Sequence, residues 1–410
     1  MKKKNLLIIT GWAPYPLCFG GNQAVFNAVD CLKGDFDIYY IYPGNEIETQ
    51  GKTYETLNEM WGNVTILPYV KPHNTSNRYL FIKKICKRLC SIFLQNNIDY
   101  KLDQELKEEI ECLDEGFLKH IHDVIKKYNI DIVQTEFNQA LSLVNSLPET
   151  VKKVFVHHEI RFVRNKLLLT RFGKSDSLLY QYKVKMMSMR EVTLLNQYDT
   201  IITLSADDKI KLESAGVTTN IIPSFAIVQD KYVFKEPAKD TNVITFVGPE
   251  EHVPNKIGVE WFIETCLGKM SSENPNIEFR IIGNWSDKTR KKYSSKTYIK
   301  FMGYVEDLQN ALQDTVMIVP IMIGSGIRMK ILEASAMGVP FVTTSIGVEG
   351  IPYTDGEECI IADSPDAFIS GIRRLSFVSN SKKFVHRAHD KYKSMYSLES
   401  LKQSRMKAYE

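Results

Sequence analysis

Short apolar runs alternate with amphipathic stretches along the whole chain, and this alternation predicts an α/β fold built on parallel sheets. The expected strands of the first half are residues 5–10, 37–42, 64–69, 131–135, 154–156, 200–205 and 220–223. Those of the second half are residues 243–247, 278–282, 299–302, 316–320, 341–344 and 359–362. Between the two series lies the polar, proline-containing segment 228–241, which is typical of an interdomain linker. The pattern therefore predicts two βα domains, at residues 1–225 and 240–385.

The stretch 315–350 carries the clearest candidate site. A β-branched apolar run opens it, and a Gly-Ser-Gly turn follows at 324–326. Ser325 is a good N-cap for a helix that starts near Gly326, and Gly338 is a good terminator for it. A strand, a glycine turn, a helix and a second strand make one βαβ unit of a parallel sheet.

The start of this helix has the chemistry of an anion site. Its first N–H groups lack intrahelical partners, and such a helix start attracts phosphate. Arg328 and Lys330 lie in the first turn or so, where the helix dipole disfavours cations and a docked anion would offset that cost. Glu333 would lie about 10 Å up the axis, within reach of a sugar hydroxyl beyond the phosphate. The alternative is a solvated Lys330–Glu333 pair above an ordinary helix cap.

Residues 324–351, GSGIRMKILEASAMGVPFVTTSIGVEGI, resemble the donor-site signature of the retaining, GT-B-fold glycosyltransferases of family four, the group 1 glycosyltransferases. In that family two glutamates eight residues apart flank the helix start; the second contacts the ribose of the sugar nucleotide and the first contacts the transferred sugar. Glu333 matches the second, whereas Ser325 stands at the first, a replacement shared by a branch with the pattern GSG-x-R-x-K-I-L-E-A. The resemblance implies two Rossmann-like, doubly wound domains that face each other across a cleft, with the terminal helix 386–410 packed back on the first.

The same resemblance implies roles for residues outside that segment. His158 matches a histidine that contacts the donor sugar and is important for transfer, and His157 is the alternative because adjacent strand residues point to opposite faces. The loop after Gly248 would face the diphosphate, although it holds Glu250 and Glu251 where many relatives have basic residues. Gly21 would border the cleft, or would serve only a tight turn. The implied donor-binding residues are Gly21, Gly248, Tyr304, Val305, Gly324, Ser325, Gly326, Arg328, Lys330 and Glu333.

Composition excludes several other classes of protein. The net charge, 52 − 49 = +3, is too small to indicate nucleic-acid binding. Seven scattered cysteines form neither a disulfide framework nor a CxxC pattern, which fits the cytoplasm, and no His/Asp/Glu spacing indicates a metal. No run approaches the eighteen apolar residues of a membrane-spanning helix.

One segment, 78–94, is both basic and amphipathic. A helix of this kind either lies on an anionic membrane surface or packs its apolar side on its own domain. Both interpretations stay open.

These observations together predict an enzyme that moves a hexosyl group from a nucleoside diphosphate sugar, with UDP or GDP as the carrier, to a hydroxyl of a glycan or lipid-linked acceptor. The expected mechanism retains the anomeric configuration and needs neither a metal nor another cofactor. The alternatives are a sugar-nucleotide epimerase on the same fold, or a catalytically silent nucleotide-binding subunit of a glycan-synthesis complex.

Overall fold

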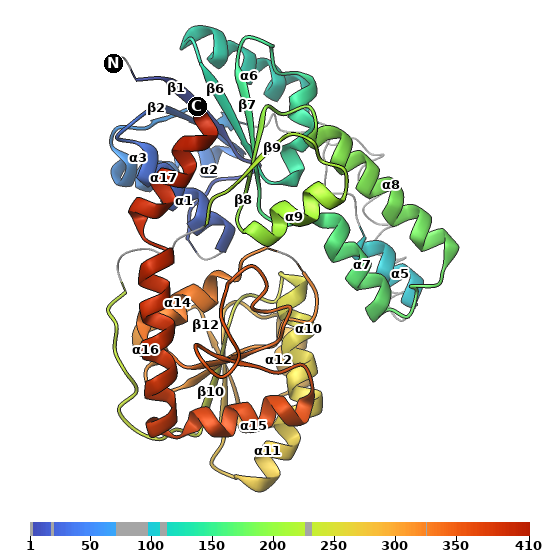
Figure 1. Cartoon of the computed structure of the whole chain (residues 1–410), viewed down its shortest axis with the longest axis vertical. Coiled ribbons are helices and arrows are strands. Elements are labelled where there is room, and N and C mark those ends of the chain that lie inside the picture. The colour runs from blue at the N-terminus through green and yellow to red at the C-terminus, as the bar shows by residue number, and fades with distance from the viewer. Residues whose placement is uncertain (1–2, 18–19, 71–96, 107–112, 226–231, 325) are drawn as a thin grey trace.

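The computed structural model describes residues 3–17, 20–70, 97–106, 113–225, 232–324 and 326–410 (Figure 1). The amphipathic segment 78–94 and the loop residue Ser325 lie outside these ranges.

The first half of the chain forms a parallel sheet in the order β4-β2-β1-β6-β7-β8-β9. Its strands are β1 (Asn5–Ile9), β2 (Asp37–Ile41), β4 (Thr65–Ile66), β6 (Ile132–Glu136), β7 (Lys152–His157), β8 (Thr200–Thr203) and β9 (Asn220–Pro223), and β3 (Pro43–Gly44) pairs separately with β5 (Tyr69–Val70). The helices of this half are α1 (Gly20–Leu32), α2 (Glu46–Gln50), α3 (Lys52–Trp61), α5 (Ile98–Glu105), α6 (Glu115–Lys127), α7 (Arg161–Arg171), α8 (Leu178–Leu195) and α9 (Ala206–Ser214), with a 3₁₀ segment at Asn138–Asn145.

The second half forms another parallel sheet, in the order β12-β11-β10-β13-β14-β15. Its strands are β10 (Val243–Val247), β11 (Glu278–Ile282), β12 (Ile299–Gly303), β13 (Val316–Val319), β14 (Phe341–Thr343) and β15 (Ile360–Ile361). The helices are α10 (Val253–Phe262), α11 (Gly268–Glu273), α12 (Asp287–Lys292), α13 (Leu308–Leu312), α14 (Met329–Met337), α15 (Pro365–Ser376), α16 (Val378–Met395) and α17 (Leu398–Tyr409), and a π-helical turn at Ile263–Leu267 joins α10 to α11.

Both sheets are doubly wound, which confirms the predicted α/β fold with two Rossmann-like halves. In each, the strand order reverses at the first strand, between β1 and β6 and between β10 and β13. Ligands of such sheets bind at the carboxyl ends of the strands beside this reversal. The strands that flank it are apolar because both faces are covered; β13, for example, is buried at every position.

The helix after β13 begins later than the sequence predicts. It starts at Met329, with Arg328 rather than Ser325 in the N-cap position. Gly324 and Gly326 have φ angles of +127° and +80°, which a right-handed helix cannot include, so the helix begins only beyond them. Its end is as predicted, at Gly338 in the left-handed conformation.

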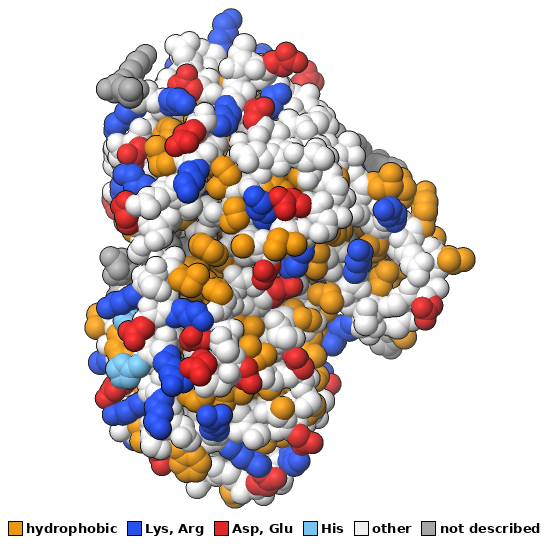
Figure 2. All heavy atoms as spheres, viewed as in Figure 1, with side chains coloured by type: hydrophobic (Ala, Val, Ile, Leu, Met, Phe, Trp, Pro, Cys, Tyr) orange, Lys and Arg blue, Asp and Glu red, His pale blue; other side chains and the backbone are white. Residues whose placement is uncertain are grey.

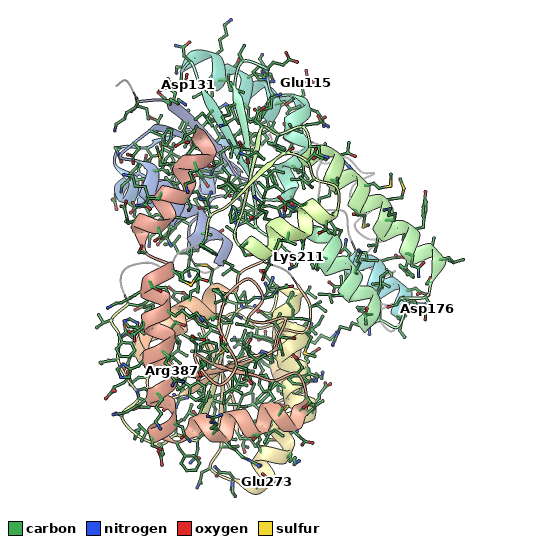
Figure 3. The ribbon with its side chains drawn as sticks, viewed as in Figure 1. Glu115, Asp131, Asp176, Lys211, Glu273 and Arg387 are labelled. Atoms are coloured by element: carbon green, nitrogen blue, oxygen red, sulfur yellow. The ribbon has the colours of Figure 1, made fainter. Side chains whose placement is uncertain are left out.

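The predicted terminal helix 386–410 is divided between the two halves (Figure 1). Its first part continues α16, which packs on α14 and α15, and its second part is α17, which packs on α1, β8 and β9. Ser397 caps α17 as predicted, by accepting a hydrogen bond from the Ser400 amide. The halves also meet at an ion pair of 2.7 Å between Lys211 on α9 and Glu349 (Figure 3).

Gly258 tests the packing of α10 on the second sheet. A Cβ at this buried position would stand 2.1 Å from the carbonyl oxygen of Pro320, at the end of β13. We expect Gly258→Ala to lower the free energy of unfolding by roughly 1–3 kcal/mol, the usual cost of overpacking a core. The control is Gly268→Ala at the start of α11, where nothing lies within 4 Å and the substitution should stabilise the helix. Chemical denaturation of both variants measures the difference, and equal stabilities would contradict the prediction.

Candidate functional site

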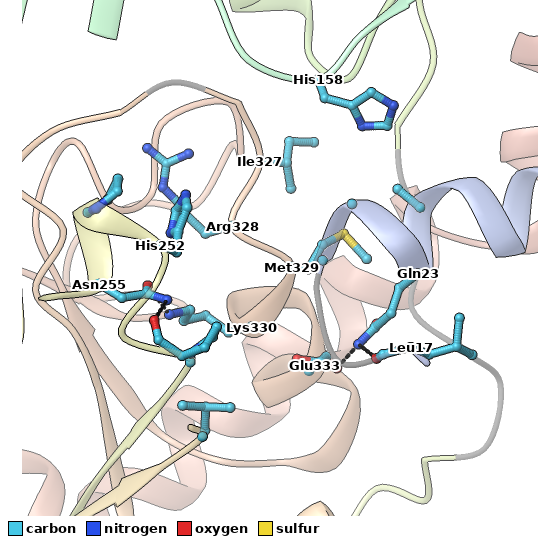
Figure 4. Close-up of a pocket in the computed structure, with 18 of the residues that line it drawn as sticks. Leu17, Gln23, His158, His252, Asn255, Ile327, Arg328, Met329, Lys330 and Glu333 are labelled. Atoms are coloured by element: carbon cyan, nitrogen blue, oxygen red, sulfur yellow. Dashed lines mark hydrogen bonds between the residues drawn. The ribbon is translucent and has the colours of Figure 1, made fainter. Parts of the chain in front are cut away.

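A cavity of about 460 Å³ lies between the two halves, at the carboxyl ends of both sheets (Figure 4). It is lined by His158 and by most of the residues that the sequence predicts for the donor: Gly21, Gly248, Tyr304, Val305, Gly324, Arg328, Lys330 and Glu333. Gly326 does not line it, and Ser325 lies outside the described residues. Residues predicted from both halves of the sequence therefore come together in one cavity.

Gly326 brings the second half of the chain against the first. A Cβ on Gly326 would stand 2.3 Å from the backbone oxygen of His158, so only glycine allows this approach. On the neighbouring loop, a Cβ on Gly248 would stand 2.5 Å from the Asn255 amide and 3.0 Å from the Lys330 ammonium. Gly248 thus leaves backbone open to the cavity beside Lys330, whereas Gly326 allows close contact between the two halves.

Arg328 and Lys330 form a cationic wall of the cavity. The Arg328 guanidinium is buried and donates to the carbonyl oxygen of Gly326. The Lys330 ammonium donates to Asn255 Oδ1 at 2.9 Å and lies 4.2 Å from the centre of the Phe246 ring. Burial, and then the positive charge of Arg328, lower the pKa of Lys330 to about 7. The arrangement holds two crowded cations, one of them poorly solvated.

Glu333 joins the two halves at the other side of the cavity. It is the fifth residue of α14, about 6 Å along the axis rather than the expected 10 Å, because the helix starts later. Its Oε1 accepts hydrogen bonds from Gln23 Nε2 at 3.1 Å and from the Tyr232 hydroxyl at 3.2 Å (Figure 4). Burial, and then the Glu333 charge, raise the pKa of Tyr232. Neither partner was predicted, since no local pattern indicates them.

His158 faces the cavity from the end of β7. Its Nε2 lies 2.5 Å from Glu136 Oε2, and its ring stacks on Phe137 with centres 4.0 Å apart. The other oxygen of Glu136 accepts from Gln134 Nε2 at 2.5 Å, and the amide oxygen of Gln134 accepts from the hydroxyl of Tyr409 on α17. A buried chain of hydrogen bonds thus runs from the cavity to the last helix.

His157 points to the opposite face of the sheet and is not in the cavity. It is 1% exposed, and its Nε2 lies 2.9 Å from Glu191 Oε1 on α8. Glu191 also accepts hydrogen bonds from the backbone amides of Arg161 and Phe162, at the start of α7. Of the two candidate histidines, only His158 has the geometry of a site residue.

Glu159 is a further cavity residue whose role the sequence did not predict. Its carboxylate lies 3.0 Å from Arg161 Nη1, and its Oε1 is 3.7 Å from where a Cβ on Gly324 would stand. Burial disfavours its charge, but the positive charges around it, Arg161 foremost, hold the pKa of Glu159 below its ordinary value. Glu159 therefore brings an ionised carboxylate from the first half of the chain to the Gly-Ser-Gly turn.

The acidic loop after Gly248 does not place its first carboxylate in the cavity. Glu250 accepts hydrogen bonds from the Ser286 amide and the Thr289 hydroxyl and pairs with Lys256 at 2.9 Å. Burial opposes ionisation, but these donors outweigh it and lower the pKa of Glu250 to about 2. The Glu250 carboxylate therefore stabilises its own domain and does not face the cationic wall of the cavity.

The described part of the chain holds neither a metal-ligand cluster nor a membrane-spanning helix. No three His, Cys, Asp or Glu residues in it are grouped to hold a metal ion. Among its helices, none has the length and apolar character needed to cross a bilayer.

Comparison with known proteins supports this assignment of the second half. Residues 241–376 match the family model of the group 1 glycosyl transferases, so this part of the chain is similar to the glycosyltransferase domains of that group, and the predicted enzyme class is confirmed. An uncharacterised 44.6 kDa protein in the cps region of Klebsiella pneumoniae is 23% identical over 422 residues, covering 96% of this chain and 98% of the relative.

Solved structures share the whole fold at low identity. Sucrose-phosphate synthase from Thermosynechococcus elongatus aligns with a TM-score of 0.71 at 12% identity, over 99% of this chain and 98% of its own. TarM aligns with a TM-score of 0.68 at 12% identity, over 100% of this chain and 99% of its own. Anabaena HepE in complex with UDP aligns with a TM-score of 0.66 at 11% identity, over 99% of each chain. These likenesses establish a GT-B fold.

Proposed function

We propose that the chain is a retaining glycosyltransferase, which moves a hexosyl group from a nucleoside diphosphate sugar to a hydroxyl of a glycan or lipid-linked acceptor. The reaction would take place in the cytoplasm, as a step in the synthesis of a surface polysaccharide. The group 1 domain supports the reaction class. The UDP bound by HepE supports a nucleoside diphosphate donor, and the cps-region relative supports a polysaccharide product.

The observation that carries the proposal is the burial of Lys330 beside Arg328, with the lowered pKa that follows from it. Its pKa of about 7 means that burial and Arg328 strongly disfavour its charge, and its hydrogen-bond partner Asn255 Oδ1 is neutral. A diphosphate against the start of α14 would supply negative charge to the Lys330 ammonium, whose printed hydrogen-bond partner is neutral, and would also lie beside Arg328. Such a cluster is costly in the free protein and is suited to an anionic ligand.

The other cavity residues fit the remaining parts of the donor. Glu333 is proposed to bind the ribose hydroxyls, and the backbone at Gly248 and Gly324 would lie against the diphosphate. Tyr304, whose side chain is 69% exposed at the mouth of the cavity, would with Val305 border the base. Where the family's first glutamate is replaced by Ser325, we assign the contact with the transferred sugar to Glu159, and Gly21 would lie beyond it.

In this mechanism the charge that develops on the leaving diphosphate is stabilised by Arg328, Lys330 and the first amides of α14. The acceptor oxygen attacks from the face that the diphosphate leaves, so the configuration is retained. Closure of the two halves on the bound donor would exclude water and suppress hydrolysis. These residues would supply the positive charge themselves, and no cofactor is invoked.

A thermal-shift screen of nucleoside diphosphates and their sugars tests the donor site, because a ligand that binds only the folded state raises its melting temperature. The donor so found is then incubated with candidate acceptors, and NMR of the product gives its anomeric configuration. An inverted product would contradict retention. A new sugar nucleotide formed without acceptor would indicate an epimerase, and binding without turnover over a broad acceptor panel would indicate a silent subunit.

The affinity for the donor should fall with rising pH. The protonated form of Lys330 binds the diphosphate, so the dissociation constant of a nucleoside diphosphate sugar should rise above pH 7, by up to tenfold per pH unit. The rise should stop at the pH where Lys330 loses its proton in the complex as well. A sugar nucleotide is used because its phosphates do not titrate in this range. Calorimetry from pH 6 to pH 9 measures the effect, about tenfold per unit at most for one proton. Lys330→Arg, which keeps its charge, should give a flat profile; a flat profile in the unmodified protein would contradict the assignment.

A further inference from the structure

One helix of the first half exposes a continuous apolar surface. Figure 1 shows α7 and α8 extending beside the two sheets, away from both. The apolar side chains on the solvent side of α8, named here the α8 ridge, are Leu178 (82% exposed), Leu179 (59%), Tyr182 (62%), Met186 (47%) and Met189 (52%). At 3.6 residues per turn they fall within roughly 100° of arc. Figure 2 shows hydrophobic side chains gathered on this projecting part of the molecule.

The ridge is separate from the face by which α8 packs on its own domain. Residues Tyr180, Val184, Glu191, Leu194 and Leu195 of the helix are buried. The helix is therefore apolar on two opposite sides, and only one of them has a partner within the described chain. A soluble surface helix normally shows polar residues opposite its packed face.

Basic residues border the ridge, and acidic ones are scarce near it. Lys185 lies at one edge, and Lys183 and Arg190 lie at the other. The single acid among the 18 residues of α8, Glu191, is buried against His157. The exposed acids nearby are Asp99, which pairs with Lys174 at 2.6 Å, Asp103, which pairs with Lys183 at 2.6 Å, and Asp176, just before the helix (Figure 3). Cations at both edges of an apolar stripe complement an anionic surface with an apolar interior.

We propose that the α8 ridge docks on an anionic lipid bilayer, with its apolar side chains in the headgroup boundary and its flanking cations against lipid phosphates. A convex stripe of this kind, with lysine at its edges and a tyrosine within it, has the character of an interfacial helix. A protein partner fits less well, because five side chains on one helix are few against the roughly 800 Å² that each side of a stable complex buries.

This docking would hold the cavity close to the membrane. Glu191 on the inner face of α8 accepts hydrogen bonds from the first amides of α7, and Arg161 there pairs with Glu159 in the cavity. One helix would thus have lipid on one face and the start of α7, which borders the cavity through Arg161, on the other. The inference does not require the transfer reaction, since it rests on the surface alone.

Sedimentation of the full chain with vesicles tests the proposal. The unmodified protein should bind vesicles that contain phosphatidylglycerol and should not bind phosphatidylcholine alone. The double variant Leu178→Gln/Leu179→Gln should weaken binding at least tenfold, and Lys185→Gln should weaken it about fivefold, as expected for one basic residue at an anionic surface. The matched control is Ile210→Gln on α9, where the side chain is also 59% exposed but lies off the ridge, and binding should be unchanged.

Three results would overturn the proposal. The first is no binding of the unmodified protein to anionic vesicles, and the second is equal binding by the ridge variants. The third is self-association of the unmodified protein that the double variant abolishes, with no vesicle binding by either. The last would assign the ridge to a second copy of the chain. Donor-induced thermal shifts of the same variants show separately whether the nucleotide site is intact, so failure of this inference and failure of the proposed function can be told apart.

Discussion

Lys330→Ala is expected to weaken binding of a nucleoside diphosphate sugar about thirtyfold, because a hydrogen bond from a charged donor to phosphate contributes roughly 2 kcal/mol. The free protein should lose no stability and should gain some. In the free state Lys330 is a poorly solvated cation beside Arg328, and its removal relieves that cost. Affinity and stability should therefore change in opposite directions, as they do when a binding site stores unfavourable charge.

Calorimetric titration and thermal denaturation of the same preparation measure the two effects. Lys300→Ala is the matched control, since this lysine belongs to the same half of the chain but is exposed on β12. It should change neither quantity appreciably. An unchanged donor affinity in Lys330→Ala would place the diphosphate elsewhere, and a large loss of stability would mean that Lys330 is a structural residue.

The order of strands and helices was predictable because each strand leaves a local signature. Strands such as β10 and β13 are covered on both faces, so their sequences are short apolar runs that end in glycine or proline. Parallel strands end at one edge, which explains why the candidate residues at those strand ends meet in one cavity; their binding roles came from the family resemblance and stay predictions. The end of α14 was predictable from Gly338 alone.

The contacts between the halves were not predictable, because they depend on how two sheets dock. Gln23 and Glu333 are 310 residues apart, and neither is marked by its neighbours in sequence. Tyr409 reaches Gln134 only because α17 returns to the first sheet. The predicted start of α14 was wrong for a local reason. Ser325 has the side chain of an N-cap, but the positive φ angles of the flanking Gly324 and Gly326 prevent the helix from beginning before them.

His158→Ala is expected to lower the turnover number by roughly 10²–10³, the usual effect of removing one positioned hydrogen-bonding group at the reacting centre. Donor affinity should change little, because His158 lies across the cavity from the cationic wall and Glu333. Its imidazole has Nε2 engaged with Glu136, so Nδ1 is the nitrogen that remains for the transferred sugar. Initial rates at saturating donor, with calorimetry of donor binding, measure the two quantities.

The neighbouring histidine supplies the contrast that makes this result decisive. His157→Ala should leave the turnover number of the folded protein nearly unchanged and should lower its melting temperature, because the buried Glu191 carboxylate loses its partner at 2.9 Å. Glu136→Gln should lie between the two: the amide oxygen still accepts from His158, so donor affinity should persist, while the lost charge lowers turnover about tenfold, or roughly 1.4 kcal/mol of transition-state stabilisation. Its amide nitrogen would then face the Gln134 Nε2 donor, so the melting temperature should fall as well. If His157→Ala instead abolished turnover in a folded protein, the roles of the two histidines would be reversed. The catalytic face of β7 would then be the one that packs against α8, and the cavity would be only a binding site.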